Sequence, residues 1–253
     1  MSNPRVVAGF RRVAIGAALF SVAVAVMVLF GWWLGSEALK SVLPGQATMK
    51  INTAIGLGVC GLALLACQWP RTRGRPASGL LSLFVMALGL ATMAQFLWGI
   101  DLGIDTLFHD DAQAFERGRI PGRMSELTTL AFALLGLAGV ASCSPRRLWL
   151  AQACALGVVL IALYAMSTYC YQMASRTAVT PFFPVAIHTA VALLVLALGW
   201  LAARPEEGMM RVLSSESFGG VLTRRALLPS LLIPSVLAFG AQWLQSNEVL
   251  TPQ

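Results

Sequence analysis

Residues 45–58 read GQATMKINTAIGLG and join a short polar phrase, Met49–Ala54, to a long apolar run. Two later stretches, Met124–Thr129 (MSELTT) and Val185–Ala190 (VAIHTA), repeat this phrase in degenerate form. The fourth position of the three copies holds Asn52, Leu127 and His188. The repetition predicts that three apolar segments begin alike and that the chain contains an internally repeated unit.

The composition sets the class of protein. Hydrophobic residues make up 57% of the 253 residues and charged residues only 11%, whereas a soluble globular domain carries about 25% charged residues. The mean hydropathy is +0.74. Because so few polar side chains cannot cover a water-soluble globule, the composition predicts an integral membrane protein surrounded by membrane lipids.

Seven apolar runs are long enough to cross a membrane as helices. Each has about 17 to 22 residues, which suits a hydrocarbon core about 30 Å thick. Helices are expected because a backbone in lipid must satisfy its own hydrogen bonds. The sequence therefore predicts an all-α polytopic bundle that forms one transmembrane domain over residues 1–253. The predicted helices are 13–34, 51–68, 79–100, 127–143, 148–169, 185–202 and 226–244.

The predicted helices follow one another with a regular rhythm. The first six form three helical hairpins, each with a longer first helix and a shorter second helix that the repeated phrase introduces. A seventh helix follows the third hairpin. We therefore expect three related helical hairpins plus one helix.

The basic residues predict the orientation. With the N-terminus inside, twelve of the eighteen Lys and Arg residues fall in inner segments and six in outer segments. This bias predicts a multi-pass protein of the bacterial cytoplasmic (inner) membrane, with a cytoplasmic N-terminus and a periplasmic C-terminus. It also accounts for the net charge of +7. No basic groove with interleaved aromatic residues is present, so no nucleic-acid partner is expected.

Two interpretations explain the polar residues of the repeated phrase. In the first, these residues cap the helices that they begin, because the first N–H groups of a helix lack intrahelical partners. In the second, the three returning helices pack together and their polar residues converge on an outward-facing cleft, which binds a small ligand or a quinone-like headgroup. The candidate ligand-binding residues are Asn52, Thr53, Thr128, His188 and Thr189.

His188 has further interpretations of its own. A neutral imidazole caps or packs, but it also ligates metals, including those of haem and chlorophyll. One membrane histidine is weak evidence for such a group, and the sequence identifies no cofactor.

A second polar cluster follows the third predicted helix. Asp101, Asp105 and His109 are spaced at i, i+4 and i+8, so on a helix they would share one face and suit a divalent cation. The alternative is a loop held by salt bridges to the nearby arginines. These are Arg117, Arg119 and Arg123. The salt-bridged loop is the preferred interpretation, so Asp101, Asp105 and His109 are weak metal candidates.

The chain carries no catalytic signature. It lacks a phosphate-binding Walker loop, a zinc-protease histidine pair and a GxSxG nucleophile elbow. The sequence therefore predicts a non-enzymatic protein.

Several ordered phrases carry a family resemblance. They are ATMKINTAIGLGVCGLALL, LWGIDLGIDTLF, PGRMSELTTLAFALLGLA, VAIHTAVALLVLALGWLAARPEEGMM and SSESFGGVLTRRALLP. This order resembles the N-terminal multi-helix membrane module of bacterial sensor histidine kinases and related PAS or GGDEF signalling proteins. The resemblance covers about residues 40 to 244 and implies a sensory input domain.

The chain departs from that family in two ways. The family's second phrase resembles Met-Ser-Pro-Asn-Thr-Ala, whereas Glu126 and Leu127 stand here in place of Pro and Asn, and Val185 replaces a Met in the third phrase. The chain also ends at Gln253, where the family continues into an output domain. We therefore expect a stand-alone module that acts through partner proteins.

Two functions remain as hypotheses. The first is a sensory module in signal transduction that binds a small ligand and passes the signal to another protein. The second is an accessory or scaffold subunit of a respiratory or photosynthetic membrane complex, which contacts partner helices, quinones or pigments.

Overall fold

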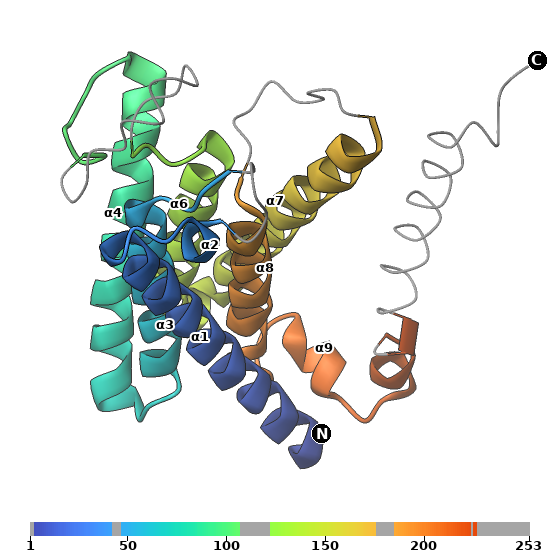
Figure 1. Cartoon of the computed structure of the whole chain (residues 1–253). Helices are drawn as coiled ribbons and strands as arrows, with labels where there is room; N and C mark the ends of the chain where they lie inside the picture. Colours follow the sequence, from blue (N-terminus) through green and yellow to red (C-terminus); the bar gives the residue numbers. More distant parts are fainter. Residues whose placement is uncertain (1–2, 42–46, 107–121, 176–184, 224, 227–253) are drawn as a thin grey trace, which may run out of the picture.

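The computed structural model of the chain describes residues 3–41, 47–106, 122–175, 185–223 and 225–226. In these residues all assigned secondary-structure elements are helices (Figure 1). The elements are α1 (Pro4–Trp33), α2 (Glu37–Lys40), α3 (Ile51–Cys67), α4 (Arg71–Trp98), α6 (Glu126–Ser142), η1 (Pro145–Arg147), α7 (Leu148–Ser175), α8 (Ile187–Ala202) and α9 (Met210–Ser214).

Long and short helices alternate. The long helices α1, α4 and α7 have 30, 28 and 28 residues, and the short helices α3, α6 and α8 have 17, 17 and 16. Three segments are long and apolar enough to cross a membrane, namely Pro4–Trp33, Thr72–Trp98 and Pro145–Tyr169. The short helices are apolar as well. These features suggest a membrane protein and agree with the all-α class expected from the composition.

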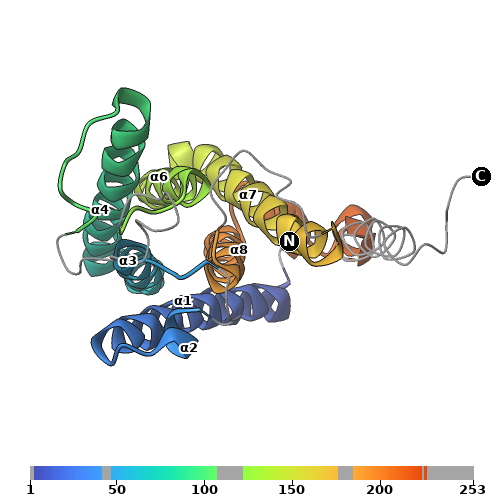
Figure 2. The ribbon, with the colours of Figure 1, turned by 45° about the horizontal axis from the view of Figure 1, so that its top comes forward.

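The short helices lie at the centre of the bundle. Each long helix packs against two short ones: α1 against α3 and α8, α4 against α3 and α6, and α7 against α6 and α8. The short helices also contact one another, and Figure 2 shows α1, α4 and α7 arranged around them. Large apolar side chains such as Leu19, Leu83 and Leu160 on the long helices stay exposed, as expected of surfaces that face lipid.

The repeated phrase sets where the short helices begin. The residues before their first turns, Lys50, Ser125 and Ala186, all have extended backbones and occupy the same position of the phrase. Burial then repeats along the helices, since the ten buried positions of α3 recur in α8, and α6 shares nine of them. The three short helices therefore present the same face to the interior.

Capping explains only one of the three helix starts. The Ser125 hydroxyl accepts a hydrogen bond from the Thr128 N–H at 3.3 Å and lies 2.9 Å from the Thr128 hydroxyl. Lys50 and Ala186 make no side-chain cap. Asn52, Thr53 and Thr189 lie inside the first turns, so the capping interpretation is wrong for these three residues.

Aromatic side chains tie two of the short-helix starts to the preceding long helix. The Trp32 indole N–H donates to the Met49 carbonyl at 2.9 Å, and the Tyr169 hydroxyl donates to the Val185 carbonyl at 2.6 Å. Met49 and Val185 hold the same position of the repeated phrase. The first and third hairpins thus fix the entry of the short helix in the same way.

The helix boundaries differ most from the expected ones at the polar ends of the long helices. Helix α1 begins at Pro4 rather than residue 13, because the Asn3 side chain accepts hydrogen bonds from the N–H groups of Arg5 and Val6 and caps it. Helix α4 begins at Arg71 rather than residue 79. An apolar run marks only the lipid-facing part of a helix. The main-chain hydrogen bonds of the helix extend beyond that run into the arginine-containing segment. The predicted helix 226–244 lies outside the described residues apart from Ala226.

Candidate functional site

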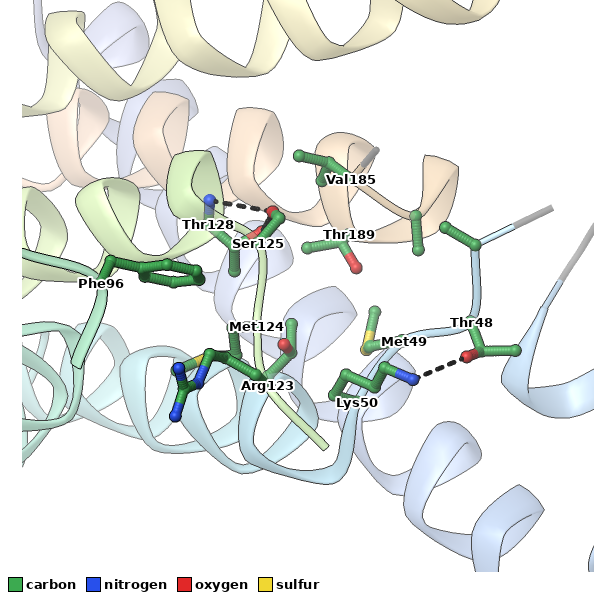
Figure 3. Close-up of a pocket in the computed structure, with 13 residues that line it drawn as sticks. Thr48, Met49, Lys50, Phe96, Arg123, Met124, Ser125, Thr128, Val185 and Thr189 are labelled. Carbon is green, nitrogen blue, oxygen red and sulfur yellow. Dashed lines mark hydrogen bonds between the residues drawn. The ribbon is translucent and has the colours of Figure 1, made fainter. Parts of the chain in front are cut away.

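A cavity opens where the three short helices begin, and we call it the threonine pocket because each short helix contributes one threonine (Figure 3). Its volume is about 50 Å³. The lining residues are Ala47, Thr48, Met49, Lys50, Thr53, Phe96, Arg123, Met124, Ser125, Thr128, Val185, Ala186 and Thr189. Nine of these thirteen residues form three sets of equivalent positions of the repeated phrase, so the repeat builds most of the wall.

The three threonines occupy one equivalent position. Thr53, Thr128 and Thr189 are 3%, 2% and 2% exposed. The Thr128 hydroxyl contacts the Ser125 hydroxyl at 2.9 Å. Those of Thr53 and Thr189 make no hydrogen bond with any described residue, and Figure 3 shows Thr189 directed into the pocket. Two buried hydroxyls are therefore available to a ligand.

The pocket lies at the positive ends of three helices. The first N–H groups of α3, α6 and α8 have no intrahelical acceptor, and the aligned peptide dipoles place partial positive charge at these ends. All three helices start beside the same cavity. The local field therefore favours a hydrogen-bond acceptor or an anion.

Two cationic residues, Lys50 and Arg123, line the pocket and differ in their partners. The Lys50 ammonium lies 3.5 Å from the Thr48 hydroxyl. The Arg123 guanidinium is 8% exposed and donates to Asp105 at 2.7 Å and to Gln95 at 3.2 Å, while lying 5.5 Å from the centre of the Phe96 ring. Because the buried Asp105 carboxylate neutralises Arg123, this side chain stabilises the pocket wall and adds little positive charge to the pocket.

Asn52 supports a loop beside the pocket. Its amide donates to the Ile104 carbonyl at 2.8 Å, and it is not among the lining residues. Gln95 accepts a hydrogen bond from the Leu102 N–H at 2.9 Å, and its amide donates to Asp105 at 3.0 Å. Together these contacts hold the segment after α4 against α3 and against the start of the second repeated phrase.

His188 does not line the pocket either. The side chain is buried at 8% exposure, and neither imidazole nitrogen has a hydrogen-bond partner among the described residues. Leu127 takes the equivalent position in the second repeat and packs beside Val185 and Ala190. The same position thus holds an amide with a partner, an apolar side chain and an imidazole that makes no described hydrogen bond.

This comparison predicts the effect of His188→Leu. A buried polar group without a partner is destabilising, so replacing it by leucine should leave the free energy of unfolding unchanged or raise it by about 1 kcal/mol. Asn52→Leu is the matched control, because it removes the bond to Ile104 and should cost about 1–3 kcal/mol. Reversible unfolding in mixed micelles measures both. An equal loss in the two variants would show that the imidazole has a stabilising partner.

The predicted metal candidates belong to the Arg123 network instead. Asp105 pairs with Arg123 at 2.7 Å, and Asp101 lies 3.8 Å from the same guanidinium. His109 lies outside the described residues. Within the part of the chain that the structure describes, no group of three or more His, Cys, Asp or Glu side chains is arranged to hold a metal ion. The salt-bridged interpretation of this loop accounts for both aspartates.

Of the five predicted ligand-binding residues, Thr53, Thr128 and Thr189 line the pocket, and Asn52 and His188 do not. The pocket is also lined by residues just before each short helix and by one residue of the long helix α4, none of which is among the predicted candidates. A signal for most of them was present, because they belong to the same repeated phrase as the threonines. They include Met49, Lys50, Arg123, Met124, Ser125, Val185 and Phe96.

A second cavity lies at the opposite ends of the short helices, beside Gln68 and Ala203. Its charged residues pair with one another, Arg11 with Glu206 at 3.8 Å and Arg204 with Glu207 at 3.7 Å. Two buried polar atoms beside it, Gln68 Nε2 and Arg204 Nε, also lack described partners. The threonine pocket is the stronger candidate because equivalent residues of all three short helices meet there.

Comparison of the chain with protein-family models, curated proteins and solved structures gives no match.

Proposed function

We propose that this chain is a non-enzymatic membrane module that binds a small ligand in the threonine pocket and acts through partner proteins. The observation that carries the proposal is the meeting of one equivalent threonine from each short helix at a single cavity. Buried hydroxyls without described partners and three converging helix N-termini suit ligand recognition. The resemblance to sensory input modules of histidine kinases and PAS or GGDEF proteins suggests that ligand binding serves signal reception.

The proposed architecture has seven transmembrane helices in three related hairpins plus one helix. Its support is the matching start of α3, α6 and α8, their matching buried positions, and the packing of each long helix between two short ones. A short helix of 17 residues spans about 26 Å, which a hydrocarbon core about 30 Å thick accommodates by thinning locally. For the helix 226–244 the support is its apolar sequence.

The proposed orientation places the threonine pocket on the periplasmic side of the bacterial inner membrane. Single-cysteine labelling with a membrane-impermeant maleimide tests it. Leu102→Cys is exposed on the pocket side and should label from outside, whereas Arg73→Cys, exposed at the start of α4, should label only after lysis. The unsubstituted protein gives the background of the native cysteines. Labelling of Arg73→Cys in intact cells would reverse the orientation.

Extraction of the native protein in mild detergent tests the function. We expect co-purification of a signalling protein such as a kinase or cyclase, identified by mass spectrometry, without stoichiometric chromophores in the absorption spectrum. An unrelated membrane protein with the same tag is the control. Stoichiometric recovery with an electron-transfer or light-harvesting complex would contradict the sensory role and make the chain an accessory subunit of that complex.

A further inference from the structure

The described residues that line the threonine pocket include no acidic side chain. None of the thirteen described lining residues is acidic, and two, Lys50 and Arg123, are basic. The carboxylate that pairs with Arg123 belongs to Asp105, which does not line the cavity. Because Asp105 neutralises Arg123 and Lys50 has further contacts, the preference of the lining for negative charge in a bound molecule comes from the three helix N-termini.

Two threonine hydroxyls indicate where the negatively charged group of a ligand would bind. Thr53 and Thr189 are more than nine-tenths buried, line the pocket and have no described hydrogen-bond partner. The two hydroxyl oxygens are not among the side-chain atoms that are sealed without a partner, so they stay open to a hydrogen-bond acceptor that occupies the cavity. They come from two different helices at equivalent positions, so a single acceptor group with two oxygens matches them.

The rest of the pocket is apolar. Met49, Met124 and Val185, again at equivalent positions, line it together with Phe96. These side chains offer no hydrogen-bond donors, so they cannot solvate an inorganic oxyanion, which needs donors on every side. They suit a molecule that is anionic at one end and apolar at the other.

The cavity limits the size of that molecule. Its volume of about 50 Å³ is well below the roughly 150 Å³ of an engineered apolar cavity that binds benzene. The part of a ligand enclosed here is therefore smaller than benzene, and the shortest aliphatic carboxylates fit this volume.

We propose that the threonine pocket binds a short-chain monocarboxylate of the size of acetate or propionate. The carboxylate accepts hydrogen bonds from Thr53 and Thr189 at the helix N-termini, and the alkyl end packs against Met49, Met124 and Val185. This inference rests on the proposed ligand-binding function and names the chemical class of the ligand.

Isosteric ligands test the inference. The purified full chain in detergent is titrated with propionate and with propionamide at matched ionic strength, and binding is followed by calorimetry and thermal unfolding. We expect saturable binding of propionate and at least tenfold weaker binding of propionamide, because only the carboxylate carries the charge that the helix ends favour. Sodium sulfate is the control for anion effects without an alkyl group and should not compete.

Threonine-to-valine variants locate the site. Thr53→Val and Thr189→Val keep the shape and remove one hydroxyl each, so each should weaken propionate binding by roughly tenfold or more. Thr92→Val is the matched control, because its buried hydroxyl bonds the Leu88 carbonyl at 3.0 Å away from the pocket. It should bind as the unsubstituted chain does, and circular dichroism checks that all three variants fold.

Each contrary outcome has a separate meaning. Equal binding of propionamide and propionate, lost in both pocket variants, would overturn the carboxylate assignment and leave the ligand-binding function standing. Competition by sulfate would assign an inorganic anion instead and also overturn it. Binding of propionate that is unchanged in both pocket variants would remove the site itself and the proposed function with it.

Discussion

Arg123→Gln is expected to lower the free energy of unfolding by about 3–5 kcal/mol. The substitution removes the cation from an ion pair whose side chains are only 8% and 3% exposed. Asp105 then keeps a buried negative charge with Gln95 as its one described hydrogen-bond donor. An uncompensated buried charge costs far more than the net contribution of the pair.

A double substitution separates charge from packing. Asp105→Asn with Arg123→Gln removes both charges and should recover at least half of the lost free energy. Arg11→Gln is the matched control, because its partner Glu206 lies 3.8 Å away and the two side chains are 61% and 51% exposed. Exposed pairs contribute about 0–1 kcal/mol. A loss in Arg123→Gln no greater than in Arg11→Gln would show that the ion pair is solvated.

Arg123→Gln should also weaken ligand binding in the threonine pocket. Arg123 directly precedes Met124 and Ser125, which line the cavity and begin α6. Loosening the Arg123 network frees this segment, so ligand binding and stability should fall together. In Thr53→Val and Thr189→Val, by contrast, binding should fall while stability stays nearly unchanged.

Gly136→Val should have the second largest effect. A Cβ atom at Gly136 would come within 3.0 Å of the Met86 backbone, since α6 and α4 approach each other closely there. Small residues allow such approaches in membrane bundles. Separating the helices to admit valine should cost about 1–3 kcal/mol or prevent folding, measured by unfolding in mixed micelles and by the monodisperse yield.

Gly16→Val is the matched control for this substitution. It makes the same chemical change inside α1, where a Cβ would meet no atom within 4 Å. Because valine has a higher helix propensity than glycine by a few tenths of a kcal/mol, the free energy of unfolding should stay unchanged or rise slightly. Comparable losses in the two variants would mean that close packing of α4 and α6 contributes little to the bundle.

The helix starts show how far the sequence predicts this fold. The repeated phrase predicts the first residue of each short helix to within two residues of its position in the structure. In all three copies an extended residue precedes the apolar run, and the helix begins at the next residue. The ends of the long helices were less predictable. Arginines extend α4 beyond its apolar run, since main-chain hydrogen bonding does not depend on hydropathy.

The candidate site shows the same division. In the cleft interpretation the polar residues of the three phrases converge, and of the five candidates Thr53, Thr128 and Thr189 line one cavity. Asn52 and His188, one residue earlier, were expected there too. Successive residues on a helix point about 100° apart, so the direction of each first turn decides which of two adjacent polar residues faces the cavity.

The sequence by itself determined that the chain is helical and apolar enough for a membrane, and that three of its helices begin with one phrase. Only the tertiary structure decided what that phrase builds. Packing of each long helix between two short ones sets the rotation of α3, α6 and α8. That rotation turns the threonines toward a shared cavity, Asn52 toward the Ile104 carbonyl and His188 into a buried site. Side-chain direction depends on neighbours distant in sequence, and no local pattern records them.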